Sequence, residues 1–162
     1  MRGVSPPRRT DDEAIPKFMR LLLRLRRIAK TSDMKAIIGL DIGGTKVEGI
    51  LWSGGKVLRS QKIKTSKNRK QFLKAVHELI QALKSGQRIR GIGISCAGAI
   101  EGRTGRIVRS PNMRYLNGLR LGGWLSKKIR VPAKIQNDTA CFLLGELRFG
   151  QARGKKNVIA LT

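Results

Sequence analysis

The sequence predicts an α/β fold built on a mixed sheet, in which three antiparallel strands form a meander and helices flank the sheet. Three observations predict this class. Three strand-like runs near the start of the core are separated by double glycines, which are typical of hairpins. Segments with helical periodicity then alternate with strand-like segments, as in parallel sheets. With 162 residues, 40% of them hydrophobic, the chain can bury a sizeable core.

The predicted meander has strands at residues 35–42, 45–52 and 56–64. We expect tight turns at Gly43-Gly44 and at Gly54-Gly55, because primed hairpin turns need the positive φ angles that glycine adopts freely.

A helix is predicted over residues 68–84, ending at Gly86. Its apolar residues share one face: Phe72, Leu73, Val76, Leu79, Ile80 and Leu83. The later elements are expected as strand 88–95, strand 106–109, helix 119–129, strand 131–136, helix 138–149 and strand 156–162.

Residues 1–33 form a basic N-terminal extension. We expect an amphipathic helix in it with Phe18, Leu21 and Leu25 on one face, which could bind a membrane surface or a partner, or pack on its own domain. Alternatively, translation starts at Met34, directly before a core strand.

The charge is strongly positive: 35 Lys and Arg against 10 Asp and Glu give +25. Such a charge favours anionic partners. The basic residues are scattered, however, and aromatics make up only 4%, whereas single-strand binders place aromatic platforms among the charges. We therefore expect no specific nucleic-acid partner.

Membrane and disulfide classes are also excluded. No apolar run approaches the roughly 20 residues of a membrane span. Two cysteines cannot make a disulfide framework or, alone, a zinc site. A cytoplasmic location is expected.

Only six acids occur in residues 34–162. Asp41 lies in an apolar strand and Asp138 at a strand-to-helix junction. A carboxylate at either position is unfavourable unless it has a partner or a functional role. The alternative is that both are solvated loop acids.

The first candidate motif is Asp41-Ile42-Gly43-Gly44-Thr45-Lys46. Its glycines would let backbone N–H groups approach an anion, with Lys46 adding charge. Asp41 could hold the waters of a Mg²⁺ ion. A plain hairpin with a lone Asp fits the same letters.

Two further motifs follow. Residues 91–98 (GIGISCAG) have the wrong spacing for a dinucleotide fingerprint, and Cys96 is expected to be a small buried residue. In Gln136-Asn137-Asp138-Thr139, Asp138 would lie at a helix N-terminus, where the dipole favours an ionised carboxylate that can accept a hydroxyl proton during phosphoryl transfer. The alternative is an N-cap, for which Asp and Asn are both suited.

In combination, IGLDIGGTK, GIGIxxxG, SPN, the ND pair before a helix containing GE, and NVIALT resemble the ROK family, which includes repressors and sugar kinases. The resemblance covers about residues 35–162. It implies the ribonuclease H-like, actin-like fold of sugar kinases, and ATP-dependent phosphorylation of a hexose or N-acetylhexosamine with ATP and Mg²⁺.

The resemblance also implies residue roles. Asp138 would be the catalytic base, and Gly98, Asn112 and Asn137 would bind the sugar. The phosphate- and Mg²⁺-binding loop would comprise Asp41, Gly43, Gly44, Thr45 and Lys46.

The sequence departs from the family in three respects. Ala97-Gly98 replaces a usual Pro-Gly, and Glu101 replaces a usual Asp. Third, in family members a second phosphate loop, a zinc-binding segment and the adenosine site follow a strand like NVIALT, whereas the sequence of this chain stops at that strand. We therefore expect residues 34–154 to be the N-terminal lobe and 155–162 the first strand of a truncated second lobe. Zinc binding and homodimer formation are expected only with that lobe, and the fragment alone is expected to be inactive.

Two alternatives remain from the sequence. One is a sugar-responsive ROK repressor lacking its DNA-binding module. The other is a basic, non-enzymatic binding protein.

Overall fold

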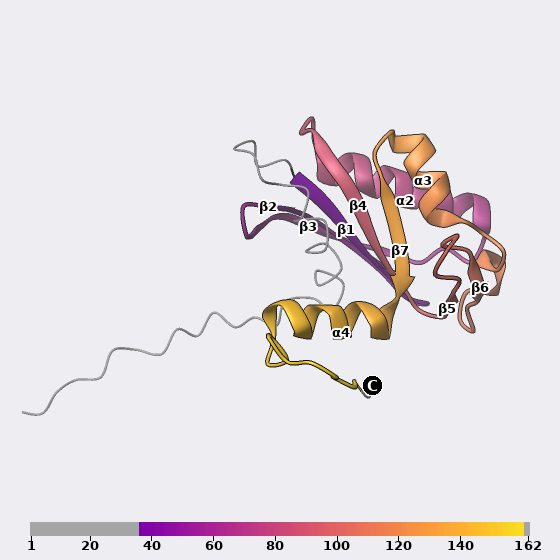
Figure 1. The fold of residues 1–162 in the computed structure, drawn as a ribbon. Helices are drawn as coiled ribbons and strands as arrows, with labels where there is room; N and C mark the ends of the chain where they lie inside the picture. The colour runs from indigo at the N-terminus through magenta and orange to yellow at the C-terminus, as the bar shows by residue number, and fades with distance from the viewer. Residues whose placement is uncertain (1–35, 161–162) are drawn as a thin grey trace, which may run out of the picture.

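A five-stranded mixed sheet forms the centre of the fold, and the computed structural model describes residues 36–160 (Figure 1). The strand order is β3-β2-β1-β4-β7. The strands are β1 (Ala36–Ile42), β2 (Lys46–Ser53), β3 (Lys56–Lys64), β4 (Ile89–Cys96) and β7 (Ala133–Asn137). The first three pair antiparallel, while β1, β4 and β7 pair in parallel. The predicted α/β class and its three-strand meander are confirmed. The amphipathic helix expected within residues 1–33 lies outside the described residues.

Helix α2 (Arg69–Lys84) follows the predicted periodicity closely. Asn68 caps its start, because the side-chain oxygen accepts hydrogen bonds from Lys70 N at 2.8 Å and Gln71 N at 3.3 Å. The helix ends at Ser85, which adopts left-handed backbone with φ 39° just before Gly86. Its buried residues are Phe72, Val76, Leu79, Ile80 and Leu83.

Helices α2 and α3 (Leu121–Ile129) lie on the same face of the sheet, behind it in Figure 1. The core is the layer between them and the sheet, where Ile38, Leu40 and Ile92 are fully buried. Helix α4 (Asp138–Phe149) instead begins directly at the carboxyl end of β7 and runs below the sheet in this view. A functional side chain at the start of α4 is therefore placed at the end of the parallel strands.

Three further elements are too short for sequence periodicity to reveal. The strands β5 (Ala99–Ile100) and β6 (Ile107–Arg109) pair as a separate two-stranded sheet, and η2 (Arg114–Leu116) is a single turn of 3₁₀-helix. Only β6 was expected as a strand. Two- and three-residue elements are too short to show a period.

The strand expected at residues 156–162 is wrong over its described part. Residues 156–160 form no strand, and Ile159 is 86% exposed. An extended run becomes a strand only when a neighbour completes its hydrogen bonds. Among the described residues nothing pairs with this run.

Candidate functional site

Three connections meet at the carboxyl ends of the parallel strands. They are the β1–β2 turn (residues 43–45), the Gly98 loop (residues 97–98) and the β7–α4 junction (residues 137–138). The register places Asp41 beside Ser95 and Ser95 beside Gln136. Ligands of open α/β sheets bind at this edge.

The β1–β2 turn is held against a loop that is distant in sequence, the Asn112 loop (residues 110–118). A Cβ placed on Gly44 would lie 2.7 Å from the Cβ of Asn112, closer than such atoms approach. Neither Gly43 nor Gly44 has a positive φ, so the expectation of a primed turn here is wrong, although Gly54 (φ 59°) and Gly55 (φ 87°) confirm it for the β2–β3 turn. Gly44 is needed because the Asn112 loop approaches its backbone.

The Gly98 loop contacts the same Asn112 loop. Gly98 has φ 128°, and a Cβ there would lie 2.9 Å from Ser110 Cα. The Ser110 hydroxyl donates to Ala97 O at 2.9 Å. Residues 98 and 112, both expected in the sugar pocket, therefore belong to loops in direct contact.

The β7–α4 junction is fixed by Asn137. Its Nδ2 donates to Gly98 O at 2.8 Å and to Asp138 Oδ1 at 2.9 Å, and its Oδ1 accepts from Ala140 N at 3.2 Å. Asn137, rather than Asp138, is thus the N-cap of α4. Asp138 is the first helical residue, and its Oδ1 also accepts from Thr139 N at 2.9 Å.

Acids gather near this edge despite the positive charge of the chain. Burial is the main cause that raises the pKa of Asp41 above its usual value, and the nearby Asp138 and Glu48 carboxylates raise it further. Ser95 and Lys46 act in the opposite direction. The Ser95 hydroxyl lies close enough to Asp41 to lower that pKa, but its geometry falls short of a hydrogen bond, and it has no partner among the described residues.

Both cysteines are buried thiols close to this edge. Burial raises the pKa of Cys96 and of Cys141 to about 12. Neither is a candidate nucleophile, in agreement with the expectation that Cys96 is a small buried residue.

The β1–β2 turn presents Thr45 and Lys46 to solvent. Lys46 pairs in register with Lys64 of β3, so two ammonium groups project from neighbouring strands beside the turn. Like charges directly opposite are unfavourable across a sheet unless an anion lies nearby.

Sequence reasoning missed Thr65. This residue follows β3, is 7% exposed, and donates from Oγ1 to Gly43 O at 2.8 Å, while its N–H donates to Thr45 O at 3.0 Å. No pattern in the sequence pointed to it, because its partners lie about 20 residues away.

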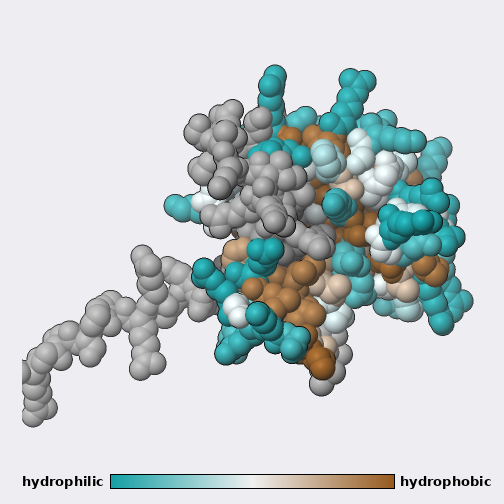
Figure 2. Space-filling view, viewed as in Figure 1, coloured by the Kyte–Doolittle hydropathy of each residue, from teal (hydrophilic) through white to brown (hydrophobic). Residues whose placement is uncertain are grey.

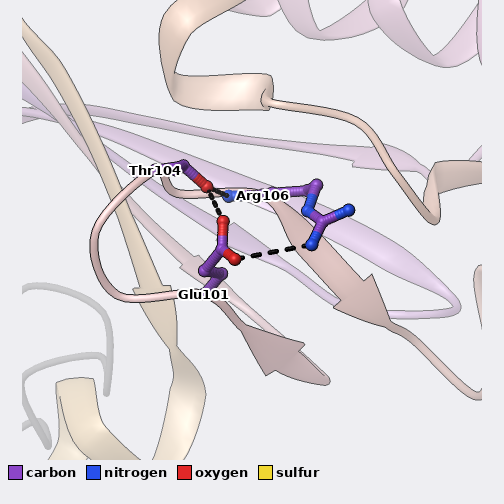
Figure 3. A network of polar contacts seen from close by, with 3 residues as sticks. All are labelled: Glu101, Thr104 and Arg106. Atoms are coloured by element: carbon purple, nitrogen blue, oxygen red, sulfur yellow. Dashed lines mark hydrogen bonds and ion pairs between the residues drawn. The ribbon is translucent and has the colours of Figure 1, made fainter.

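Glu101 lies outside this edge, in the β5–β6 connection (Figure 3). It accepts hydrogen bonds from the Thr104 hydroxyl and from Arg106 Nη2 at 3.4 Å. The Thr104 hydrogen bond is the main cause that lowers the pKa of Glu101. Glu101 therefore stabilises the turn of this hairpin.

Within residues 36–160 no helix is long and apolar enough to cross a membrane. The same part of the chain contains no cluster of three or more His, Cys, Asp or Glu side chains arranged to hold a metal ion.

The profile of the ROK family matches residues 37–162. A glucokinase from Streptomyces coelicolor is 28% identical over 130 residues, which cover 80% of this chain and 41% of that protein. A xylose repressor from Caldicellulosiruptor bescii is 29% identical over 127 residues, covering 74% of this chain and 32% of the repressor. The chain thus spans less than half the length of these relatives.

Among solved structures, a ROK family glucokinase from Streptomyces griseus in complex with glucose and AMPPNP superposes with a TM-score of 0.67 at 25% identity. The match covers 74% of this chain and 38% of that protein. The ribonuclease H-like, actin-like sugar-kinase fold is therefore confirmed.

Proposed function

Because the chain belongs to the ROK family, we propose that it is the N-terminal lobe of an ATP-dependent kinase acting on a hexose or an N-acetylhexosamine. The observation that carries this proposal is the meeting of the β1–β2 turn, the Asn112 loop and Asp138 at one edge of the sheet. A phosphoryl-transfer site needs an anion-binding turn, a pocket for the acceptor and a carboxylate beside it.

Asp138 is the proposed base. It would accept the proton of the sugar hydroxyl that attacks the phosphoryl group. Gly98, Asn112 and Asn137 would line the sugar pocket. This arrangement supplies orientation, which contributes much of the rate in phosphoryl transfer.

The donor side is assigned to Asp41, Gly43, Gly44, Thr45 and Lys46. Asp41 fits a magnesium ion, which is usually held through one or two carboxylates and several waters. Its partly buried carboxylate lies beside the unpaired Ser95 hydroxyl. A bound Mg²⁺ would neutralise phosphate charge, while Lys46 would attract the phosphates to the turn.

Residues 34–154 are proposed as one lobe, and 155–162 as the beginning of a second. A two-lobe kinase closes its cleft over both substrates. Residues 1–162 alone should therefore bind sugar weakly and show no ATP-dependent phosphorylation of a hexose.

The test combines sugar binding with turnover. Titration of residues 1–162 with glucose and N-acetylglucosamine, followed by NMR, should shift the Gly98 and Asn112 resonances, and Asn112→Ala should weaken that binding. In a polypeptide carrying both lobes, Asp138→Asn should abolish turnover while sparing sugar binding. Retained turnover would exclude Asp138 as the base, and absence of binding to any sugar would contradict the proposed function.

A sugar-responsive repressor is the second candidate, favoured by the similarity to the xylose repressor. Titration against duplex DNA separates the two candidates. Sequence-specific binding that survives raised salt favours the repressor, whereas binding that ignores sequence and disappears with salt is the charge attraction expected from +25.

A further inference from the structure

We propose that the β3–α2 junction (residues 65–69) is a clasp that couples the β1–β2 turn to the Asn112 loop, with Thr65 and Arg69 as positioning residues. In the proposed kinase, on which the functional meaning of the clasp rests, these two loops serve the phosphate donor and the sugar acceptor. The clasp would fix the two substrates relative to each other.

One end of the junction holds the β1–β2 turn. Thr65 donates to Gly43 O through its hydroxyl at 2.8 Å and to Thr45 O through its backbone N–H at 3.0 Å. Thr65 is 7% exposed. Removing its hydroxyl would leave the Gly43 carbonyl oxygen, in a partly buried turn, without this donor.

The other end of the junction holds the Asn112 loop. Arg69, the first residue of α2, donates from Nε to Tyr115 O at 2.7 Å and from Nη2 to Asn117 O at 2.9 Å. These carbonyls lie at the end of η2, where the short helix leaves oxygens without internal partners. The Tyr115 hydroxyl in turn donates to Ser66 O. A guanidinium supplies both donors in one fixed fork, which a lysine cannot reproduce.

The hydrogen bonds continue from Arg69 into the site. The Asn117 side chain accepts from Ser110 N at 2.9 Å, and the Ser110 hydroxyl donates to Ala97 O at 2.9 Å. Between Ser110 and Asn117, Asn112 lies against Gly44. The two loops therefore touch directly and are also joined through five consecutive residues of the junction. Such a closed arrangement transmits a disturbance on one side to the other.

Amide hydrogen exchange in the full chain, followed by NMR, tests the coupling without any substrate. The Gly43 N–H, bonded to Lys46 O, reports on the β1–β2 turn, and the Ser110 N–H reports on the Asn112 loop. Thr65→Val and Arg69→Met should each speed exchange at both reporters by about tenfold. Thr65→Ser, which keeps the hydroxyl, should restore slow exchange, and Lys70→Met, at the next position of the same helix, should change neither reporter.

The Ile92 amide, which donates to Pro132 O in the core, separates local loosening from global unfolding. Where a variant also speeds exchange at Ile92, Arg69→Lys, which keeps the charge but loses the fixed fork of donors, provides a milder form of the same test. If each substitution speeds exchange only in the loop that loses its own hydrogen bond, and not at the reporter in the other loop, the proposed coupling is wrong.

Glucose provides the functional arm. Saturating glucose should slow exchange at Gly43, and Arg69→Met should remove that effect while retaining glucose binding. Failure of the chain to bind any of the sugars tested, glucose and N-acetylglucosamine included, would contradict the proposed function but leave the exchange test of the clasp decisive. Glucose binding without any effect on Gly43 would overturn the coupling alone.

Discussion

The β1–β2 turn and the β7–α4 junction bring polar groups to the same edge of the sheet by opposite means. The turn is held by contacts from outside, since Thr65 and Asn112 approach it from distant segments. The junction is held mainly by its own residues, since Asn137 caps α4 and donates to the adjacent Asp138, and a single bond, from Asn137 to Gly98 O, reaches a distant loop. Two motifs that are each continuous in sequence can thus differ in how far they depend on the rest of the fold, and here the β1–β2 turn depends on it more than the β7–α4 junction does.

The largest expected effect concerns the externally held turn. Gly44→Ala should lower the free energy of unfolding by about 2–3 kcal/mol, because the new Cβ collides with the Cβ of Asn112 rather than with a flexible side-chain end. Urea denaturation of residues 1–162 measures the change. Gly102→Ala is the control, since no atom within 4 Å would meet its Cβ. Equal effects of the two substitutions would show that the Asn112 loop does not constrain the turn.

The next effect concerns the junction. Asn137→Ala should cost about 2 kcal/mol, because it removes a cap and leaves Gly98 O without its donor. Asn68→Ala removes only the cap of α2 and should cost about 1 kcal/mol by the same measurement. Asn137→Asp, which keeps the cap, should fall between wild type and Asn137→Ala. If Asn137→Ala costs no more than Asn68→Ala, the bond to the Gly98 loop contributes nothing.

A smaller effect follows from Asp41. The pKa of Asp41 is raised in the folded chain, so as the pH rises the unfolded chain loses this proton first. The free energy of unfolding therefore falls as the pH rises from the usual pKa of an aspartate to the raised pKa of Asp41 in the folded chain. Asp41→Asn should therefore raise Tm at neutral pH relative to wild type and lose that advantage in acid. Thermal unfolding across pH 3–8 measures this, taking about pH 3 as below the unfolded pKa. A Tm difference that is constant with pH would contradict the assignment.

The smallest effect is expected at the Glu48–Lys62 ion pair of β2 and β3, whose N–O distance is 3.4 Å. Lys62 is largely exposed, so Glu48→Gln should change the free energy of unfolding by less than about 0.5 kcal/mol. The same substitution removes a carboxylate that raises the pKa of Asp41. In Glu48→Gln, the Asp41 ¹³C titration followed by NMR should move to lower pH, because a carboxylate that raises the Asp41 pKa is lost. Lys62→Met removes a positive charge instead and should not move that titration to lower pH.

The sequence by itself determined the order of the main elements. The residues of β1 form a short continuous apolar run, apolar residues alternate in β2, and in α2 they repeat with the period of a helix. These patterns depend on neighbours only a few residues away. The start of α2 at Asn68 and the placement of Asp138 in the first turn of α4 follow from local capping chemistry in the same way.

The tertiary structure alone decided how the site is held together. Gly44 is required by the approach of Asn112, Thr65 bonds Gly43 across 22 residues, and Arg69 reaches Asn117 across 48. The strand expected after residue 155 did not form among the described residues, since a strand depends on a partner that its own letters do not supply. Hydrogen bonds and close approaches between distant segments leave no period in the sequence, so they emerge only when the chain is folded.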